Sequence, residues 1–172
     1  MQKLFAALLS LCLILSAFAA FAEEPVAVNW SEYEAQAAGM EGQFAQISST
    51  GLKMFIPAQF KDTELSEETL AGGTFMVLKP EEENAVVNAQ VVSMDIELFK
   101  AVLAKQGVST WETVVNGLAF TQFTVEADGI LTASFALPTT QNTTLVFSFL
   151  PANQEPYTSM FKVMIASLQL AE

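Results

Sequence analysis

Hydrophobic positions recur along most of the chain with the two-residue period of β-strands, and a few stretches show the longer period of a helix. The strand-like runs are residues 44–48, 52–56, 74–78, 85–92, 113–115, 118–125, 130–137 and 144–150. Asn116-Gly117 and Asp128-Gly129 separate neighbouring runs and predict tight turns between paired strands. The alternation across 130–137 predicts a strand with one buried face and one face in water, as in an antiparallel sheet.

Helical spacing of apolar residues predicts three longer helices and a short helical turn at 66–70. The first helix covers 30–40, where Ser31 and Glu34 have the spacing of a capping box. The second covers 95–106, with Asp95 as its N-cap and Gly107 as its stop. The last runs from Tyr157 to Leu168 and has an apolar stripe wide enough to pack across a sheet. Consecutive strands with a few amphipathic helices predict an α+β sandwich.

The N-terminal segment 1–22 has the pattern of an export signal. One cation, Lys3, precedes an apolar run, and Ala20-Phe21-Ala22 places small residues at the two positions that a signal peptidase reads. We therefore expect cleavage after Ala22, which leaves residues 23–172 as a single α+β domain and a secreted or otherwise extracytoplasmic protein. An uncleaved anchor is the alternative, and only then is a membrane expected as a partner. Lipidation at Cys12 is disfavoured, because Leu11 stands where a small residue is needed.

Charge and composition exclude several functional classes. The 172 residues include seven Lys+Arg and nineteen Asp+Glu, for a formal net charge of −12, so no nucleic-acid partner is expected. The 52% hydrophobic content is too high for a disordered chain. Beyond the signal there is no Cys, His or Arg. The usual thiolate nucleophile, general base, transition-metal ligands and bidentate anion clamps are therefore missing, and we expect no catalytic, cofactor or metal residues.

The remaining candidates for chemistry are few. The loop 81–84, Glu-Glu-Glu-Asn, offers oxygen ligands for calcium but has the composition of a solvated charge run. Ser159 and Lys162 have Ser-x-x-Lys spacing, but Lys162 lies off the apolar stripe and is expected to be exposed. A carboxylate-dependent hydrolase needs convergent acids. The acids to locate for that purpose are Glu97, Glu112, Glu126 and Asp128.

Three large aromatic residues lie at or near the ends of predicted elements, namely Trp30, Tyr33 and Trp111. Amphipathic rings at such positions can anchor a protein partner, and partial burial over a sheet edge is the alternative. These three residues are the predicted partner contacts.

Four segments together resemble small secreted bacterial proteins of the PsbP-like fold. They are GLKMFIP at 51–57, NG at 116–117, FSFLP at 147–151 and IASLQ at 165–169, with the central helix between the first two. The resemblance spans about residues 42–170. It implies a curved antiparallel sheet of about six to seven strands flanked by helices, with the helix at 30–40 as an addition. Members include an extrinsic photosystem subunit and a Ran-binding protein, so the fold implies binding roles and no single activity.

Two functions of different classes follow. The first is an exported, non-catalytic binding or accessory domain that recognises a protein or a component of the cell envelope. The second is a small secreted hydrolase that uses carboxylates, for which two or more acids must converge in a cleft. A carrier of a small apolar ligand, held between the Phe-rich sheet and a helix, is a further alternative.

Overall fold

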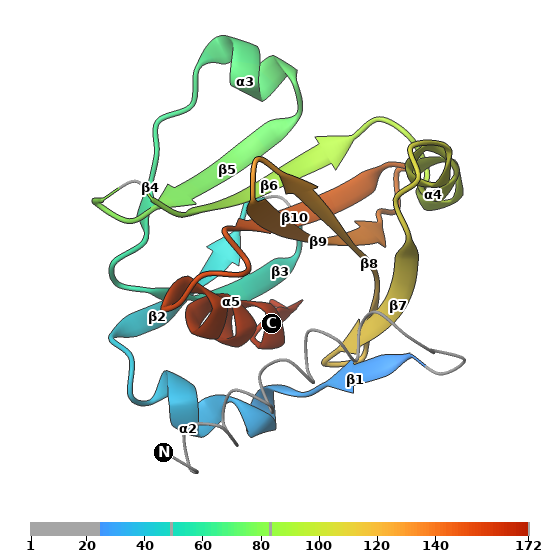
Figure 1. Cartoon of the computed structure of the whole chain (residues 1–172). Coiled ribbons are helices and arrows are strands. Elements are labelled where there is room, and N and C mark those ends of the chain that lie inside the picture. Colours follow the sequence, from blue (N-terminus) through green and yellow to red (C-terminus); the bar gives the residue numbers. More distant parts are fainter. Residues whose placement is uncertain (1–24, 49, 83, 172) are drawn as a thin grey trace.

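The computed structural model of the chain describes residues 25–171 except 49 and 83. The predicted signal segment 1–22, including Cys12, lies outside the described residues. Strands and helices follow one another through two sheets that enclose a helix near the C-terminus (Figure 1). Among the described residues, no helix is both long and apolar enough to cross a bilayer.

The larger sheet has eight strands in the order β1-β7-β8-β9-β10-β6-β5-β4. Its strands are β1 (Val26–Val28), β4 (Lys61–Asp62), β5 (Thr74–Lys79), β6 (Val86–Val92), β7 (Thr110–Val115), β8 (Leu118–Ala127), β9 (Ile130–Pro138) and β10 (Thr144–Leu150). Neighbouring strands are antiparallel except β1, which pairs in parallel with β7.

The smaller sheet has the order β11-β3-β2 and consists of β2 (Gly42–Ile47), β3 (Leu52–Pro57) and β11 (Gln169–Leu170). The helical segments are η1 (Trp30–Glu32), α2 (Glu34–Ala37), α3 (Glu67–Ala71), α4 (Ile96–Lys105) and α5 (Tyr157–Ala166). The α+β class is therefore confirmed, but the number of strands is higher than the predicted six to seven. The pattern missed β1, β4 and β11, because two or three residues are too few to show a period.

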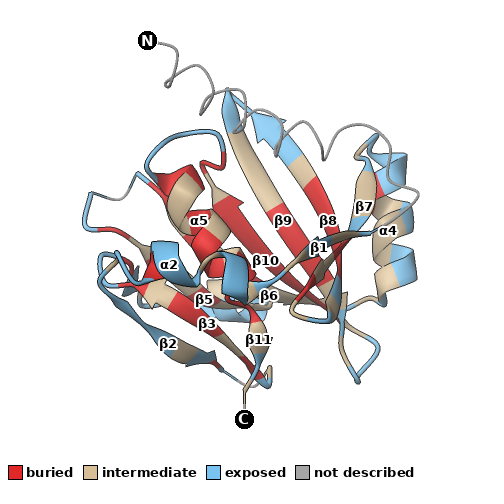
Figure 2. Ribbon diagram, turned by 90° about the horizontal axis from the view of Figure 1, so that it is seen from below, coloured by how far each residue is buried: buried red, intermediate tan, exposed pale blue. Residues whose placement is uncertain are grey.

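Most of the core lies on the inner face of the larger sheet, which we define as the face toward α5 and the smaller sheet. On β10, Phe147 and Phe149 point inward and have no exposed surface. Phe161 of α5 packs on Phe149 with ring centroids 5.5 Å apart, and Met54 of β3 closes the core from the other side. Figure 2 shows this buried zone, in red, on α5 and on the neighbouring parts of β10 and β9. The apolar stripe of the last helix thus packs against the sheet, as the sequence predicts.

The opposite, outer face corrects the prediction that one side of this sheet lies in water. Ser134 and Ala136 of β9 retain only 3% and 0% exposure, although the alternation places them on the polar side. Helix α4 covers that side: Leu103 packs on Phe123, Ala136 and Val146 in a second hydrophobic cluster. The prediction was wrong for this part of the strand, because α4 is amphipathic and buries its stripe there, which alternation within a single strand cannot reveal; Ile130, at the start of the strand, is exposed.

Local signals for turns and caps are mostly confirmed. Asn116 and Gly117 have φ of 48° and 81°, and Asp128 and Gly129 have φ of 53° and 76°, as tight hairpin turns require. The side chain of Asp95 caps α4, since its Oδ1 accepts from the Leu98 N–H at 2.9 Å.

The helix predicted at 30–40 is wrong in length and in its cap. It consists of the three-residue η1 and the four-residue α2, whose N-caps are Asn29 and Tyr33, and neither makes a side-chain cap bond. The Ser31–Glu34 capping box does not form. A segment this short cannot sustain a full α-helix by propensity, and it is held instead by contacts of Trp30 and Ala37 with Phe55 and Val163.

Candidate functional site

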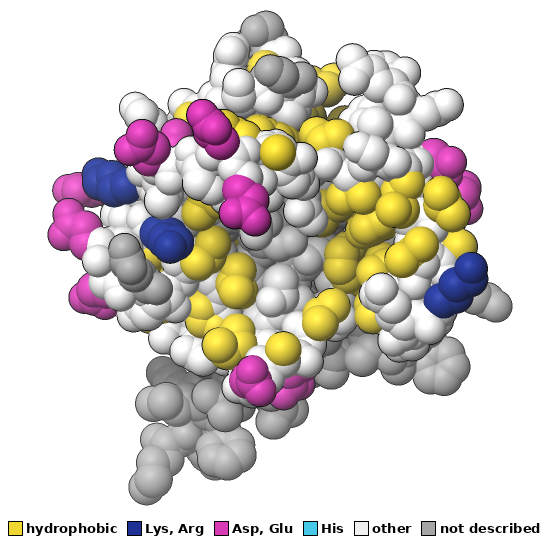
Figure 3. Space-filling view, turned by 90° about the horizontal axis from the view of Figure 1, so that it is seen from above, with side chains coloured by type: hydrophobic (Ala, Val, Ile, Leu, Met, Phe, Trp, Pro, Cys, Tyr) yellow, Lys and Arg dark blue, Asp and Glu magenta, His cyan; other side chains and the backbone are white. Residues whose placement is uncertain are grey.

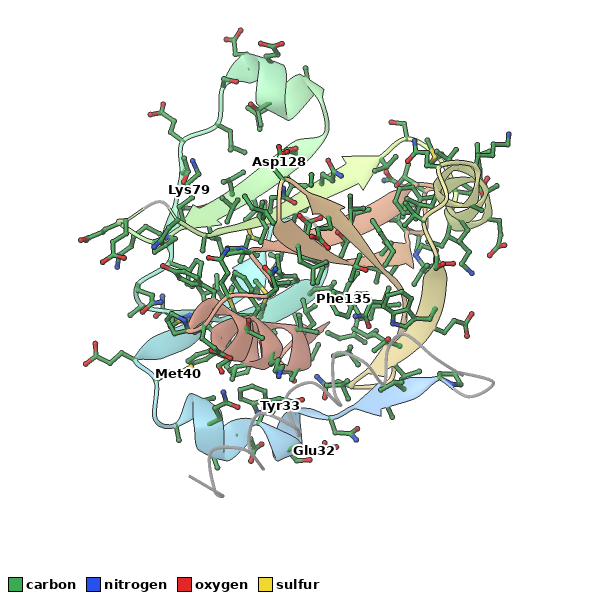
Figure 4. All side chains as sticks on the ribbon, in the orientation of Figure 1. Glu32, Tyr33, Met40, Lys79, Asp128 and Phe135 are labelled. Carbon is green, nitrogen blue, oxygen red and sulfur yellow. The ribbon has the colours of Figure 1, made fainter. Side chains whose placement is uncertain are left out.

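A cavity of about 80 Å³ lies between α5, the segment β1–η1 and the inner face of the larger sheet. Its walls are mainly apolar and include Ala133, Phe135, Phe149, Phe161 and Ile165. Figure 4 shows Phe135 on the sheet side, while Tyr33 rises from the segment below α5 toward that helix. The cavity exists because β1 and η1 approach α5 from the side that the smaller sheet leaves uncovered.

Asn116 holds together the two walls of the cavity that lie opposite the sheet, namely α5 and the segment β1–η1. Its Nδ2 donates to the carbonyls of Ala166 and Leu168 at 2.7 and 2.8 Å, just beyond the cavity face of α5. Its Oδ1 accepts from the Trp30 N–H at 2.7 Å. One side chain in the β7–β8 turn therefore ties the C-terminal end of α5 to the start of η1. The sequence indicated a turn at this residue but not these three bonds, which join positions far apart in the chain.

Three of the polar side chains in the walls already have partners inside the protein. Thr113 donates to Oε1 of Gln122 at 2.8 Å, and both side chains are buried. Thr158 donates to the carbonyl of Ala152 at 3.0 Å. These bonds remove part of the cost of burying polar groups. They also orient fixed dipoles along an otherwise apolar space.

Lys162 differs from the other polar groups of the cavity. It was expected to be exposed, but it is half-buried and lines the cavity. Burial lowers the pKa of Lys162, and the charge of Glu155 opposes that shift. The one ion pair among the described residues joins Lys100 to Glu97 at 3.1 Å, so no described carboxylate lies within 4 Å of the Lys162 ammonium. A half-buried cation in a mainly apolar lining, with no described carboxylate within 4 Å, is the most unusual group of the site.

Tyr33 is the second titratable group of the cavity. Its hydroxyl has no hydrogen bond to any described residue. Burial raises the pKa of Tyr33, and the adjacent charge of Glu32 raises it further, so the phenol stays protonated and can donate. Lys162 and Tyr33 thus present a cation and a neutral O–H donor to the same apolar space.

The pairing of Ser159 with Lys162 as a hydrolytic dyad receives no support. Ser159 donates its hydroxyl hydrogen bond to Oε1 of Glu155 at 3.1 Å, and no hydrogen bond joins it to Lys162 among the described residues. The helix face that reaches the cavity consists instead of Thr158, Phe161, Lys162 and Ile165, spaced i, i+3, i+4 and i+7. That spacing was visible in the sequence, but it signals a site only once the sheet opposite is known.

The three predicted partner contacts do not form one surface. Trp30 is half-buried, with its ring 5.3 Å from that of Phe44 and 6.3 Å from that of Phe55. Tyr33 follows it on the same segment and borders the cavity. Trp111 lies near the start of β7, opposite Gln122 of β8. Trp30 lies near the other end of β7, because its N–H donates to Asn116 in the turn that follows this strand.

The acids named as possible catalytic groups are dispersed. Glu97, Glu112, Glu126 and Asp128 are all exposed, and none lines the cavity under α5. The described residues contain no cluster of three acids that could hold a metal ion. From above, acidic side chains lie mostly toward the edge of the molecule, around apolar side chains nearer its middle (Figure 3).

A wider groove of about 860 Å³ lies near the acidic loop. Glu81 and Glu82 border it together with Lys61, Met40 and Met160, while Glu83 lies outside the described residues. Asn84 donates to Glu82 at 3.4 Å and accepts from the Tyr157 hydroxyl, so part of the loop's oxygen set is bound within the protein. The groove is wider and more polar than the cavity under α5.

Comparison with known proteins shows the fold. No family model matches the sequence, and no curated protein is similar to it. The solution structure of cyanobacterial PsbP (CyanoP) from Synechocystis sp. PCC 6803 is similar with a TM-score of 0.53 and 11% identity, over 77% of this chain and 94% of that one. The resemblance to the PsbP-like fold is thereby confirmed for the architecture.

Two further solved structures are more distant. A crystal structure from Bacteroides thetaiotaomicron VPI-5482 has a TM-score of 0.49 and 12% identity, over 77% of this chain and 50% of that one. The Saccharomyces cerevisiae Ran-binding protein Mog1p has a TM-score of 0.44 and 11% identity, over 76% and 96% of the two chains.

Proposed function

We propose that the protein is an exported, non-catalytic binding or accessory domain of the cell envelope or exterior, and that the cavity under α5 is its binding site. The observation that carries the proposal is the lining of this cavity. Apolar rings surround a few oriented polar groups, which is the usual composition of a small-molecule binding site.

Hydrolysis by carboxylates requires two acids that face the same substrate bond, one as acid and one as base or nucleophile. The cavity contains no described carboxylate, and the four acids considered are exposed on α4, β7, β8 and the β8–β9 turn. The hydrolase alternative therefore gains no support from the described residues. The apolar-ligand carrier does gain support, and it becomes the specific form of the binding role.

Export and location outside the cytoplasm rest on the N-terminal pattern of Lys3, an apolar run and Ala20-Phe21-Ala22. N-terminal sequencing of the protein released by the expressing cells tests this part. We expect the released chain to begin at Glu23. A chain that keeps Met1 and sediments with membranes would contradict export with cleavage.

Thermal unfolding of the released protein tests the binding role. The panel contains short apolar acids, alcohols and amides, and also Ca²⁺, sugars, lipids and peptides. A ligand of the folded state at a hundred times its dissociation constant adds about 2.7 kcal/mol, which raises the midpoint by several degrees. We expect a rise with small apolar compounds and no hydrolysis of ester or glycoside substrates.

Ala133→Leu is the matched variant, because Ala133 lines the cavity and a leucine adds three carbons to a space of about 80 Å³. We expect this variant to fold and to lose the ligand-induced rise. A rise that persists in Ala133→Leu would place the binding site elsewhere. Turnover that depends on Glu112 or Glu126 would overturn the non-catalytic role.

A further inference from the structure

The cavity under α5 combines features that are unusual in so acidic a protein. Only six of the described residues are lysines and the sequence has no arginine, yet one of those lysines, Lys162, faces an apolar space. A half-buried ammonium without a described carboxylate within 4 Å has lost part of its hydration, and the charge of Glu155 acts on it only from beyond ion-pair distance. An anion in the cavity would supply the missing partner.

From this arrangement we propose that the ligand is a small monocarboxylate with a branched or straight apolar body of three to five carbons. Its body fills the recess between Phe135, Phe149 and Ile165, and its carboxylate contacts the Lys162 ammonium and accepts from the Tyr33 hydroxyl. The inference rests on the proposed function and names the chemistry of the ligand at that same site.

The size of the ligand follows from the volume. A cavity of about 150 Å³ lined by apolar side chains is large enough for benzene. The space under α5 is about 80 Å³, so it accepts an aliphatic group of the size of a valine or leucine side chain and excludes long acyl chains. Lys162 and Tyr33 in the same lining offer partners to the charged end of the ligand.

The charge of the ligand follows from the donors. One ammonium and one phenol match a carboxylate, whereas a phosphate dianion is usually held by more donors and often by arginine. The strongly negative chain also repels polyanions at long range. The site therefore selects a monoanion attached to an apolar body. A free short-chain acid and the C-terminal residue of a peptide both have this chemistry.

Binding to the released protein is measured by calorimetry and by chemical shifts of the cavity residues. The probes are isovalerate, its neutral analogue 3-methylbutan-1-ol and inorganic phosphate. Two further probes are N-acetylvaline, which has a free carboxylate, and N-acetylvaline amide, which has none. We expect isovalerate to bind at least tenfold more tightly than the alcohol, and phosphate to produce no shift in the cavity. If N-acetylvaline binds better than isovalerate and its amide does not, the source is a peptide C-terminus. The reverse order indicates a free acid.

Lys162→Met and Tyr33→Phe test the two contacts, and Lys105→Met is the matched control. Lys105 is exposed at the end of α4 on the other side of the sheet, so its replacement changes the net charge equally without touching the cavity. We expect Lys162→Met to weaken isovalerate at least tenfold, Tyr33→Phe about threefold, and Lys105→Met less than twofold.

Two results would overturn the inference and leave the proposed function standing. One is equal affinity of the native protein for isovalerate and the alcohol, a comparison that does not depend on whether any variant folds. The other is an unchanged affinity for isovalerate in Lys162→Met. If instead no compound of any class binds and Ala133→Leu behaves like the native protein, the proposed binding role fails together with the inference.

Discussion

The two faces of the eight-stranded sheet both bury side chains, but in different ways and to different extents. The inner face packs aromatic rings from β9 and β10 against α5 and the smaller sheet, and it contains the cavity with Lys162 and Tyr33. The outer face is covered by one helix, α4, and contains a buried hydrogen bond between the hydroxyls of Ser134 and Ser148 at 2.9 Å. The inner face thus combines the main core with the site, whereas the outer face is a thinner layer that closes the sheet.

The largest expected difference between the faces comes from deleting one ring on each. Phe147 points inward from β10 with 0% exposure, and Phe123 points outward from β8 with 7% exposure and contacts Phe99 of α4. We expect Phe147→Ala to lower the free energy of unfolding by about 4–5 kcal/mol and Phe123→Ala by about 3 kcal/mol, since the thinner layer relaxes more easily. Urea unfolding measures both. Equal losses would contradict the division into a main core and a closing layer.

Asn116 gives the next largest effect, because it connects the inner face to α5 and η1. Asn116→Gly keeps the positive φ of the turn but removes the three hydrogen bonds to Trp30, Ala166 and Leu168. We expect a loss of about 2–3 kcal/mol in the free energy of unfolding, at about 1 kcal/mol per bond. Amide exchange in η1 and at the end of α5 should rise most. Asp128→Gly, in the other tight turn of the same kind, is the control and should change little.

The buried hydroxyl pair of Ser134 and Ser148 provides a test of the outer face. Ser134→Ala leaves the Ser148 hydroxyl buried without its partner, and we expect a loss of about 1–2 kcal/mol. In the double variant Ser134→Ala, Ser148→Ala neither polar group remains, so the loss should shrink to near zero. A double-mutant cycle measures this coupling. Additive losses would mean that the two hydroxyls do not depend on each other.

The smallest effect is a pH dependence that only the inner face shows. Lys162 has a lowered pKa in the folded state, so the unfolded chain binds more protons below the ordinary value of 10.5 and native stability rises with pH there. Tyr33 has a raised pKa, so the folded chain keeps its proton longer and native stability falls above 10.0. The charged groups acting on them are Glu155 and Glu32.

Urea midpoints between pH 8 and 11 test this pair. We expect Lys162→Met to be more stable than the native protein at pH 8 and to lose that advantage as the pH rises. Tyr33→Phe should remove part of the decline above pH 10. Lys105→Met has the same charge change outside the cavity, and its difference from the native protein should stay nearly constant. The assignment of these effects to the cavity is wrong if Lys105→Met follows Lys162→Met.

The sequence by itself determined the elements whose signals are local. The alternation along 144–150, the N-cap at Asp95 and the turns at Asn116 and Asp128 all appear where the pattern places them, because strand period, capping and positive φ depend on neighbouring residues. The order of these elements predicted the α+β class, and the PsbP-like architecture was predicted from the resemblance of four segments to known proteins.

Only the tertiary structure decided which faces meet. It placed α4 over part of the outer face, joined the three-residue β1 in parallel to β7, and put the half-buried Lys162 of α5 in the lining of the cavity. It also brought Asn116 to the carbonyls of Ala166 and Leu168, fifty and more positions away. The physical reason is that burial and hydrogen bonding at these positions depend on partners from distant segments. A local pattern can show that a side chain is polar, but not which cavity or carbonyl it will face.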